Sequence, residues 1–307
     1  MAKVPCEFTF LGTGGSAGIP NLRHALQPAA ACAVCGDAMK VESKNRRGNP
    51  SLLVQAQAPD GTNVAFVVDM GKTFAERART ILPGRKVAGL DGVLLTHCHM
   101  DAVLGLDDLR EVQLAAADPE VWSVRSSTPV YASGKTLKEV QQIFPYMFPE
   151  KEPAAQSSGN RMVGMCTANE LLPLETTVIS GVPVTPLPVF HGGEYVCYGY
   201  AFGRRGTVVY LSDVSAVPDH VLTVLKGYDI AVLIVDAVSP ESARYAHWGL
   251  PQALELIRTL RPKQGLLIGM SCEFDHDATN AELARDQTIA DTQLAFDGQT
   301  VAVELDS

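Results

Sequence analysis

The strongest constraint on this chain is an apolar run that passes directly into alternating polar side chains, at residues 94–101 (LLTHCHMD). The apolar part predicts a buried strand. Imidazoles two residues apart, here His97 and His99, can leave a sheet on the same side and share one divalent metal ion. Asp101 would add an oxygen ligand for that ion or a neighbouring one, and it is also a candidate catalytic residue. An accidental pair of surface histidines is the alternative, but the chain has only 7 His, which favours a metal site.

The rest of the chain predicts β-sheet layered with helices. Short β-rich runs alternate with glycine turns and with helical stretches near 218–226 and 250–260, so we expect an α/β fold in which two β/α halves pack as a sandwich. The polar stretch 150–160 predicts a loop rather than a domain boundary, and we expect residues 1–307 to form one domain. The predicted strands are Glu7–Gly12, Ser51–Ala56, Val64–Met70, Gly92–Thr96, Val130–Ala132, Val182–Phe190, Tyr198–Gly203, Thr207–Leu211, Ile230–Val235 and Gly265–Gly269.

Composition excludes several classes of protein. A hydrophobic content of 46% with 19% charged residues is enough for a sizeable core, which excludes a disordered chain, collagen and a coiled coil. Because 34 Asp and Glu outnumber 25 Lys and Arg, the surface repels phosphate backbones as a whole, and we expect no non-specific nucleic-acid binding. A small anionic substrate could still enter a locally positive or metal-loaded cleft.

The apolar runs also argue against a membrane location. The longest of them, such as 229–238, carry charges or are far shorter than the roughly 20 residues that a membrane span needs. The start of the chain reaches Glu7 and then glycines before any long apolar stretch, so it does not resemble a secretory signal. We therefore expect a cytoplasmic protein whose 7 Cys are buried residues or metal ligands rather than a disulfide framework.

Two short motifs near the N-terminus have alternative interpretations. The glycines of 12–15 (GTGG) suggest a phosphate loop, but no Lys-Ser/Thr pair follows, which favours a tight turn. Cys32 and Cys35 form a Cys-x-x-Cys knuckle that can hold half of a tetrahedral structural zinc site. A redox dithiol is the alternative, but the βα context of a thioredoxin motif is missing.

Taken in order, these motifs resemble the metallo-β-lactamase superfamily. The resemblance rests on the His-x-His-x-Asp run after a strand, on the earlier Asp69 and Gly71, and on the later His191, Asp213 and Asp236. It covers essentially the whole chain and implies a four-layer αβ/βα sandwich. The opening GTGGSAGIP, the Cys-x-x-Cys and 105–110 (GLDDLR) are most similar to PhnP-type cyclic phosphodiesterases and their eukaryotic relatives, with ribonuclease Z a more distant relative.

The resemblance implies a catalytic metal centre. It assigns His97, His99 and His191 to a first ion and makes Asp213 the carboxylate that bridges toward a second ion. His247 matches a histidine that faces the substrate phosphate, and an imidazole that titrates near neutrality can protonate a leaving group. The implied reaction is attack of a metal-bound hydroxide on phosphorus.

The second metal position departs from the family pattern. Ala102 stands in the sixth place of the family's HxHxDH, and Gly269 stands where a ligand histidine is expected. Two remaining carboxylates without imidazole favour a weaker ion, Mn²⁺ or Mg²⁺, over Zn²⁺. The metal count is thus open between one and two, and three further side chains are candidate substitute ligands: Asp107, Asp108 and His276.

The resemblance also extends the cysteine knuckle. PhnP-type proteins carry three cysteines in this loop and complete the site with a residue after the final motif. Here Cys272 falls in that place, and His24 is the nearest candidate for the missing cysteine. We therefore expect a structural Zn²⁺ site made of Cys32, Cys35, Cys272 and His24.

The resulting prediction is a metal-dependent hydrolase, with a phosphodiesterase of small phosphodiesters or cyclic phosphates as first choice. The same chemistry could hydrolyse a thioester or lactone, and the missing ligands could mark a degraded enzyme that acts as a binding protein. The acidic balance and the lack of a basic, glycine-rich arm disfavour a ribonuclease Z role. We expect a small-molecule substrate and no membrane partner, and we leave a homodimer open.

Overall fold

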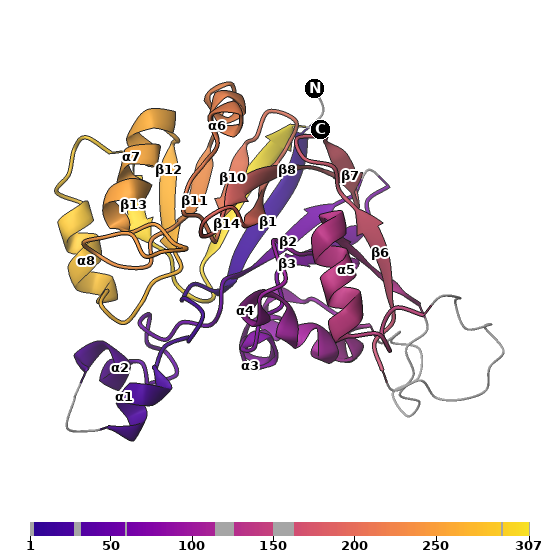
Figure 1. Cartoon of the computed structure of the whole chain (residues 1–307), viewed down its shortest axis with the longest axis horizontal. Coiled ribbons are helices and arrows are strands. Elements are labelled where there is room, and N and C mark those ends of the chain that lie inside the picture. Colours follow the sequence, from indigo (N-terminus) through magenta and orange to yellow (C-terminus); the bar gives the residue numbers. More distant parts are fainter. Residues whose placement is uncertain are drawn as a thin grey trace.

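Two β-sheets face each other and carry helices on their outer sides (Figure 1). The computed structural model describes residues 3–27, 32–58, 60–113, 126–149, 163–289 and 291–306, so the predicted loop 150–160 lies outside the described residues. The first sheet has 7 strands in the order β14 (Thr300–Asp306), β1 (Lys3–Gly12), β2 (Ser51–Gln57), β3 (Asn63–Val68), β4 (Gly92–Leu94), β5 (Thr128–Ala132) and β6 (Cys166–Glu170).

The second sheet repeats this design. Its 7 strands lie in the order β13 (Asp291–Leu294), β12 (Gln264–Ile268), β11 (Val232–Asp236), β10 (Val208–Leu211), β9 (Val196–Phe202), β8 (Val182–Phe190) and β7 (Thr177–Ile179). From β10 to β13 the strands are parallel and are joined by helical crossovers, whereas β7 to β10 are antiparallel. The helices are α1 (Leu22–Leu26), α2 (Ala33–Asp37), α3 (Phe74–Ile81), α4 (Met100–Val103), α5 (Gly134–Ile143), α6 (Asp219–Lys226), α7 (Leu250–Leu260) and α8 (His276–Leu283), with 3₁₀ turns η2 (Pro83–Arg85) and η3 (Leu104–Val112).

Side-chain alternation explains why both faces of each sheet are covered. On β2, Leu52 and Val54 point into the core between the sheets, while Leu53 packs on the opposite face beneath α3 and α5. On β11, Ile234 lies in the central core and Leu233 packs on the face covered by α6 and α7. Because consecutive residues point to opposite faces, strands buried on both sides are apolar throughout. The four-layer α/β sandwich expected from the sequence is thereby confirmed.

Contacts between the sheets fix the segment that follows β4. The hydroxyl of Tyr200 donates to the carbonyl oxygen of Leu95 at 2.6 Å, and the amide of Tyr198 donates to the carbonyl oxygen of Thr96 at 2.9 Å. Tyr200 is fully buried, so its hydroxyl needs such a partner. These bonds connect β9 of the second sheet to the residues that follow β4 of the first sheet, just before His97.

Candidate metal centre

The first two histidines are positioned by the turn that leaves β4. Asp69, which follows β3, accepts hydrogen bonds from the amide of Thr96 at 2.8 Å and from its hydroxyl at 2.8 Å. The Thr96 hydroxyl has thereby used its proton, so it accepts from Nδ1 of His97, 2.8 Å away. This leaves Nε2 of His97 without a proton, and that atom is buried with no hydrogen-bond partner among the described residues. Such an outer hydrogen bond is how proteins orient a metal-binding imidazole.

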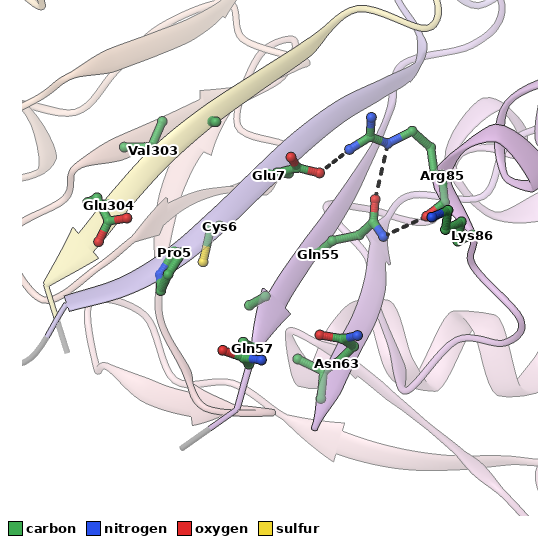
Figure 2. A pocket seen from close by; sticks show the side chains of 13 residues that line it. Pro5, Cys6, Glu7, Gln55, Gln57, Asn63, Arg85, Lys86, Val303 and Glu304 are labelled. Carbon is green, nitrogen blue, oxygen red and sulfur yellow. Dashed lines mark hydrogen bonds and ion pairs between the residues drawn. The ribbon is translucent and has the colours of Figure 1, made fainter. Parts of the chain in front are cut away.

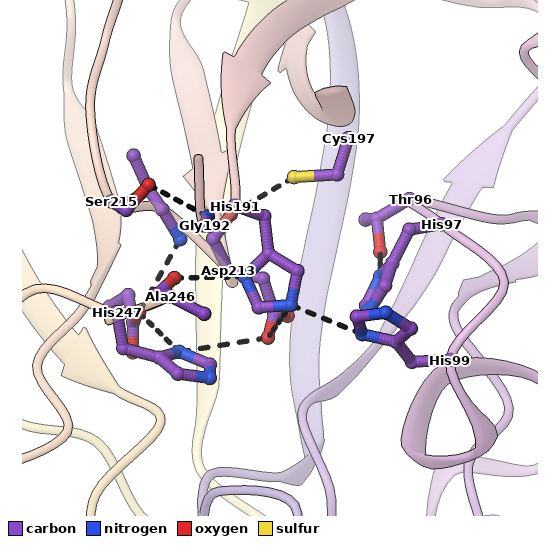
Figure 3. Close-up of polar contacts among 12 residues, drawn as sticks. Thr96, His97, His99, His191, Gly192, Cys197, Asp213, Ser215, Ala246 and His247 are labelled. Atoms are coloured by element: carbon purple, nitrogen blue, oxygen red, sulfur yellow. Dashed lines mark hydrogen bonds and ion pairs between the residues drawn. The ribbon is translucent and has the colours of Figure 1, made fainter. Parts of the chain in front are cut away.

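The third histidine comes from the other sheet, directly after β8. His191 Nδ1 donates to the carbonyl oxygen of Ala246 at 2.9 Å, and Nε2 lies 3.2 Å from Nδ1 of His99 (Figure 3). The ring centroids of His97, His99 and His191 are 4.5 to 5.0 Å apart. The structure therefore brings the three histidines of the sequence hypothesis together, although 92 residues separate His99 from His191.

Asp213 completes what we call the histidine centre, which comprises His97, His99, His191 and Asp213. Asp213 follows β10, is buried, and has Oδ1 3.9 Å from Nε2 of His191. Two nitrogen ligands about 2.1 Å from a zinc ion, at a tetrahedral angle, lie about 3.4 Å apart. The spacing between the three histidines, together with the unpaired Nε2 of His97, therefore fits a divalent ion.

The electrostatics keep these groups in the protonation states that metal binding needs. Burial lowers the pKa of His97 to about 4, and the neighbouring His191 and His99 lower it further against the pull of Asp213. Burial also lowers the pKa of His191. The pKa of Asp213 is raised by burial, but the nearby histidines outweigh that effect and lower it overall. At neutral pH the imidazoles of His97 and His191 are thus neutral ligands and the carboxylate is ionised.

His247 stands beside the centre and is paired with a carboxylate that the sequence analysis had not given a role. Its Nδ1 lies 2.8 Å from Oδ2 of Asp236 and 3.8 Å from Oδ1 of Asp213. Burial raises the pKa of Asp236, at the end of β11, to about 7. Burial alone would lower the pKa of His247, but the hydrogen bond and charge of Asp236 raise it to about 9. His247 therefore holds a proton at neutral pH.

Asp101 and the three candidate substitute ligands are not members of the ligand groups that the described residues form. Asp101 is buried at the start of α4 and lies near enough to raise the pKa of His247, but it belongs to none of the ligand groups formed by the described residues. Asp107 accepts hydrogen bonds from Arg110 and Tyr146, at 2.8 and 2.9 Å.

Asp108, seven residues beyond Asp101, does not lie on one α-helical face with it. The α-helix ends at Val103 and continues as a 3₁₀ helix, in which seven residues do not return to the same face. His276 is also not brought to the centre: it begins α8, and its Nε2 lies 3.1 Å from Nδ2 of Asn280.

A second group, the Cys/His cluster, comprises His24, Cys32, Cys35 and Cys272. His24 Nδ1 lies 3.3 Å from Sγ of Cys35 and 3.6 Å from Sγ of Cys272. One ligand atom from each residue lies within 4.8 Å of the others. Zinc–sulfur bonds of about 2.3 Å place tetrahedral thiolates about 3.8 Å apart, so the four side chains fit one tetrahedral ion. Burial and the other two cysteines raise the pKa of Cys272 to about 12.

A hollow of about 640 Å³ lies over β14, β1, β2 and β3 (Figure 2). It is lined by Glu7 of β1, Gln55 of β2, Asn63 of β3 and the ion-paired Arg85. Asn63 begins β3, whereas the histidine centre lies beyond the end of that strand, about 20 Å away at 3.3 Å per residue. The hollow is therefore separate from the chemistry.

Sequence analysis also missed an aromatic ring at the rim of the centre. Tyr195 stacks on His99, with ring centroids 5.1 Å apart and planes 13° from parallel. Lys135, near the start of α5, holds its ammonium 4.4 Å from the centroid of the Tyr195 ring. A lone tyrosine in a loop and a lysine 60 residues before it carry no motif, so no local signal identified them.

The four-layer sandwich, with imidazoles converging at the strand ends, defines a metal-dependent hydrolase fold. A family model described as a β-lactamase superfamily domain matches residues 65–270. The chain belongs to this superfamily, whose members are hydrolases. No helix among the described residues is long and apolar enough to cross a membrane.

Three individual proteins illustrate what this chain is similar to. A diphosphatase of the PhnP family has a structure that superposes with a TM-score of 0.75 at 28% identity and covers 99% of this chain and 100% of its own, which confirms the expected likeness to PhnP-type proteins. The short form of human tRNase Z superposes with a TM-score of 0.58 at 15% identity, covering 96% of this chain and 98% of its own. An octanoyltransferase of Porphyromonas gingivalis (strain ATCC BAA-308 / W83) is 26% identical over 261 residues, 85% of this chain. The chain spans only 45% of the length of that protein.

Proposed function

We propose that this protein is a phosphodiesterase that hydrolyses small phosphodiesters or cyclic phosphates at the histidine centre. The observation that carries the proposal is the convergence of three imidazoles on one point beside His247. We propose Zn²⁺ as the ion of the three histidines and of the Cys/His cluster.

A divalent ion bound there would lower the pKa of a water molecule and neutralise charge on a phosphoryl group. The protein's own side chains account for the other requirements. His247 carries a proton at neutral pH and lies at the edge of the centre, so it can hydrogen-bond a phosphoryl oxygen or protonate a departing alkoxide. Lys135 adds a positive charge one aromatic ring away from His99, which favours an anionic substrate in a chain of net charge -9.

The relatives support a phosphoryl substrate more than an acyl one. The PhnP-family diphosphatase matches over its full length, so its phosphoryl chemistry is the better guide. The octanoyltransferase is matched over less than half of its length, and its acyl activity motivates the runner-up, hydrolysis of a thioester or lactone.

The test is a substrate comparison with purified protein loaded with Zn²⁺ or Mn²⁺. We expect turnover of bis(p-nitrophenyl) phosphate and of cyclic nucleoside monophosphates, and no turnover of p-nitrophenyl octanoate. A His97→Ala, His99→Ala variant is the matched control and should lose the activity. Turnover of the acyl ester alone would replace the proposal by an acyl hydrolase, and no turnover of either class with metal bound would favour a binding protein.

A further inference from the structure

Two groups of ligand-forming side chains lie at the histidine centre, and His191 belongs to both. His97, His99 and His191 form the first group, and His191, Asp213 and His247 form the second. His191 donates its Nδ1 proton to the carbonyl oxygen of Ala246 at 2.9 Å, so only Nε2 keeps a free lone pair. One lone pair binds one ion. His191 therefore cannot bind an ion in each of the two groups at the same time.

The distances favour the first group. Nε2 of His191 lies 3.2 Å from Nδ1 of His99 but 3.9 Å from Oδ1 of Asp213. Nε2 of His97 is buried and has no hydrogen-bond partner in the part of the chain that is described, so it needs an ion or a donor in the space between the three rings.

The second group also loses a nitrogen of His247. Nδ1 of His247 lies 2.8 Å from Oδ2 of Asp236, a carboxylate with no exposed surface. This hydrogen bond occupies Nδ1 of His247 whichever of the two groups holds the proton, so Nδ1 is not a metal ligand. Such a buried carboxylate also fixes the ring orientation and leaves Nε2 as the free nitrogen of His247.

Asp236 also leaves no room for a ligand side chain at Gly269, directly after the neighbouring strand β12. Its Oδ1 faces Gly269, where a Cβ atom would lie only 2.1 Å away. Gly269 also has a φ of +77°, a conformation that side chains other than glycine rarely adopt. Ala102, the other position at which the family pattern expects a histidine, is buried in the apolar cluster beneath α3 and α5. Neither position supplies a ligand atom.

We infer that the histidine centre binds one divalent ion rather than two, and that Asp236 is a positioning residue that keeps His247 out of the ligand set and directs its Nε2 to the substrate. This inference rests on the proposed function, since it assumes that the three histidines hold a catalytic ion. It adds the metal count and a role for Asp236 to that proposal.

Counting ions separates this inference from the proposed function. Wild type, His97→Ala/His99→Ala, His247→Ala and the control His220→Ala, an exposed histidine on α6, are saturated with Zn²⁺ or Mn²⁺, desalted, and analysed by elemental analysis and native mass spectrometry. We expect the double variant to lose one ion and the other two variants to lose none. Loss of two ions in the double variant, or of one ion in His247→Ala, would overturn the inference and leave the proposed function standing. Loss of no ion in the double variant would overturn both.

Two spectroscopic measurements avoid dependence on variants that fail to fold. In Mn²⁺-loaded wild type, electron paramagnetic resonance should show an isolated Mn²⁺ ion, and an exchange-coupled pair would overturn the inference. In Zn²⁺-loaded protein with ¹⁵N-labelled histidine, the Nδ1 proton of His247 should give a downfield resonance that vanishes in His247→Ala and in Asp236→Ala and persists in His220→Ala. A resonance that survives Asp236→Ala would remove the role assigned to Asp236.

Discussion

The histidine centre and the Cys/His cluster both bring together ligand-forming side chains that are far apart in the sequence, but they are built in different ways. The histidine centre lies at the ends of long, buried strands, and two of its imidazoles are held by hydrogen bonds that they donate to Thr96 and Ala246. The Cys/His cluster draws on α1 and α2, which have five residues each, and on Cys272 after β12.

This difference indicates which of the two sites needs a bound ion to hold its ligand side chains in place. Helices of five residues are far below the length at which a helix is stable in water. The apolar group around the cluster is small, comprising Ile19, Val34, Cys35 and Ala38, while Leu22 and Leu26 are 71% and 72% exposed. We therefore expect metal binding to organise the Cys/His cluster, whereas the histidine centre is preformed by the sheets.

The largest effect is expected from a substitution that disrupts the histidine centre alone. His97→Ala removes a ligand from a scaffold that needs no ion to fold, so kcat/KM for bis(p-nitrophenyl) phosphate should fall by about 10³-fold or more, the loss of roughly 4 kcal/mol of metal-ion catalysis. Thermal unfolding of the variant should stay cooperative. Retention of more than a tenth of the activity would contradict the assignment of the ion to His97.

The second prediction concerns His276, which is connected to the Cys/His cluster through Asn45. We expect the free energy of unfolding to fall in acid because the folded state binds the His276 proton poorly. The His276 amide donates to Oδ1 of Asn45, whose Nδ2 donates to Asp37 at the end of α2. Burial, with Arg47 and Lys44 nearby, lowers the pKa of His276 from 6.5 to about 4, so the unfolded chain takes up the proton first as the pH falls. Stability is thus unaffected above about pH 6.5 and is lost progressively down to pH 4, by about 3 kcal/mol.

Urea unfolding at pH 7 and pH 4 checks this prediction. His276→Gln should reduce the loss of unfolding free energy by about that 3 kcal/mol, while His220→Gln should not. An equal pH dependence of His276→Gln and wild type would show that His276 is not the group responsible.

A third change disrupts the Cys/His cluster and spares the histidine centre. Cys35→Ser removes one thiolate ligand, and the zinc affinity of the cluster should fall at least about 100-fold, measured by competition with a chromogenic chelator. Because the strand ends hold the catalytic histidines independently, kcat on bis(p-nitrophenyl) phosphate should change by less than about threefold, roughly 0.6 kcal/mol. A loss of activity as large as that of His97→Ala would mean that the two sites are not independent.

Sequence patterns predicted the parts of this molecule that depend on local signals. The apolar run before His97 and the strand-end position of Asp213 carry their signal in a few neighbouring residues, and α7 was expected at its observed bounds. The Cys/His cluster needed the family resemblance, since 240 residues separate Cys32 from Cys272. The single domain of residues 1–307 stays a prediction.

The remainder depended on tertiary contacts. Strand β14 was not predicted, although Val301, Val303 and Leu305 alternate in the pattern of a half-buried strand, and its pairing with β1 joins the two ends of the chain. The pair of Asp236 and His247 forms only because residues 237–249 fold back over the strand ends, which no spacing between the two residues encodes. The change from α to 3₁₀ geometry after Val103, which separates Asp108 from the helix face of Asp101, has no clear sequence signal.

The smallest expected effect concerns the rim of the histidine centre. Lys135→Gln removes an exposed ammonium that stands over Tyr195, so it should raise KM for an anionic phosphodiester about fivefold, roughly 1 kcal/mol, with kcat unchanged. Lys138→Gln, an exposed lysine on the same helix, is the matched control and should leave KM unaltered. Because exposed charges are screened by salt, the difference should shrink as ionic strength rises. A salt-independent change in kcat would instead mean that Lys135 acts by positioning Tyr195 against His99, and the rim would then belong to the preformed scaffold rather than to substrate attraction.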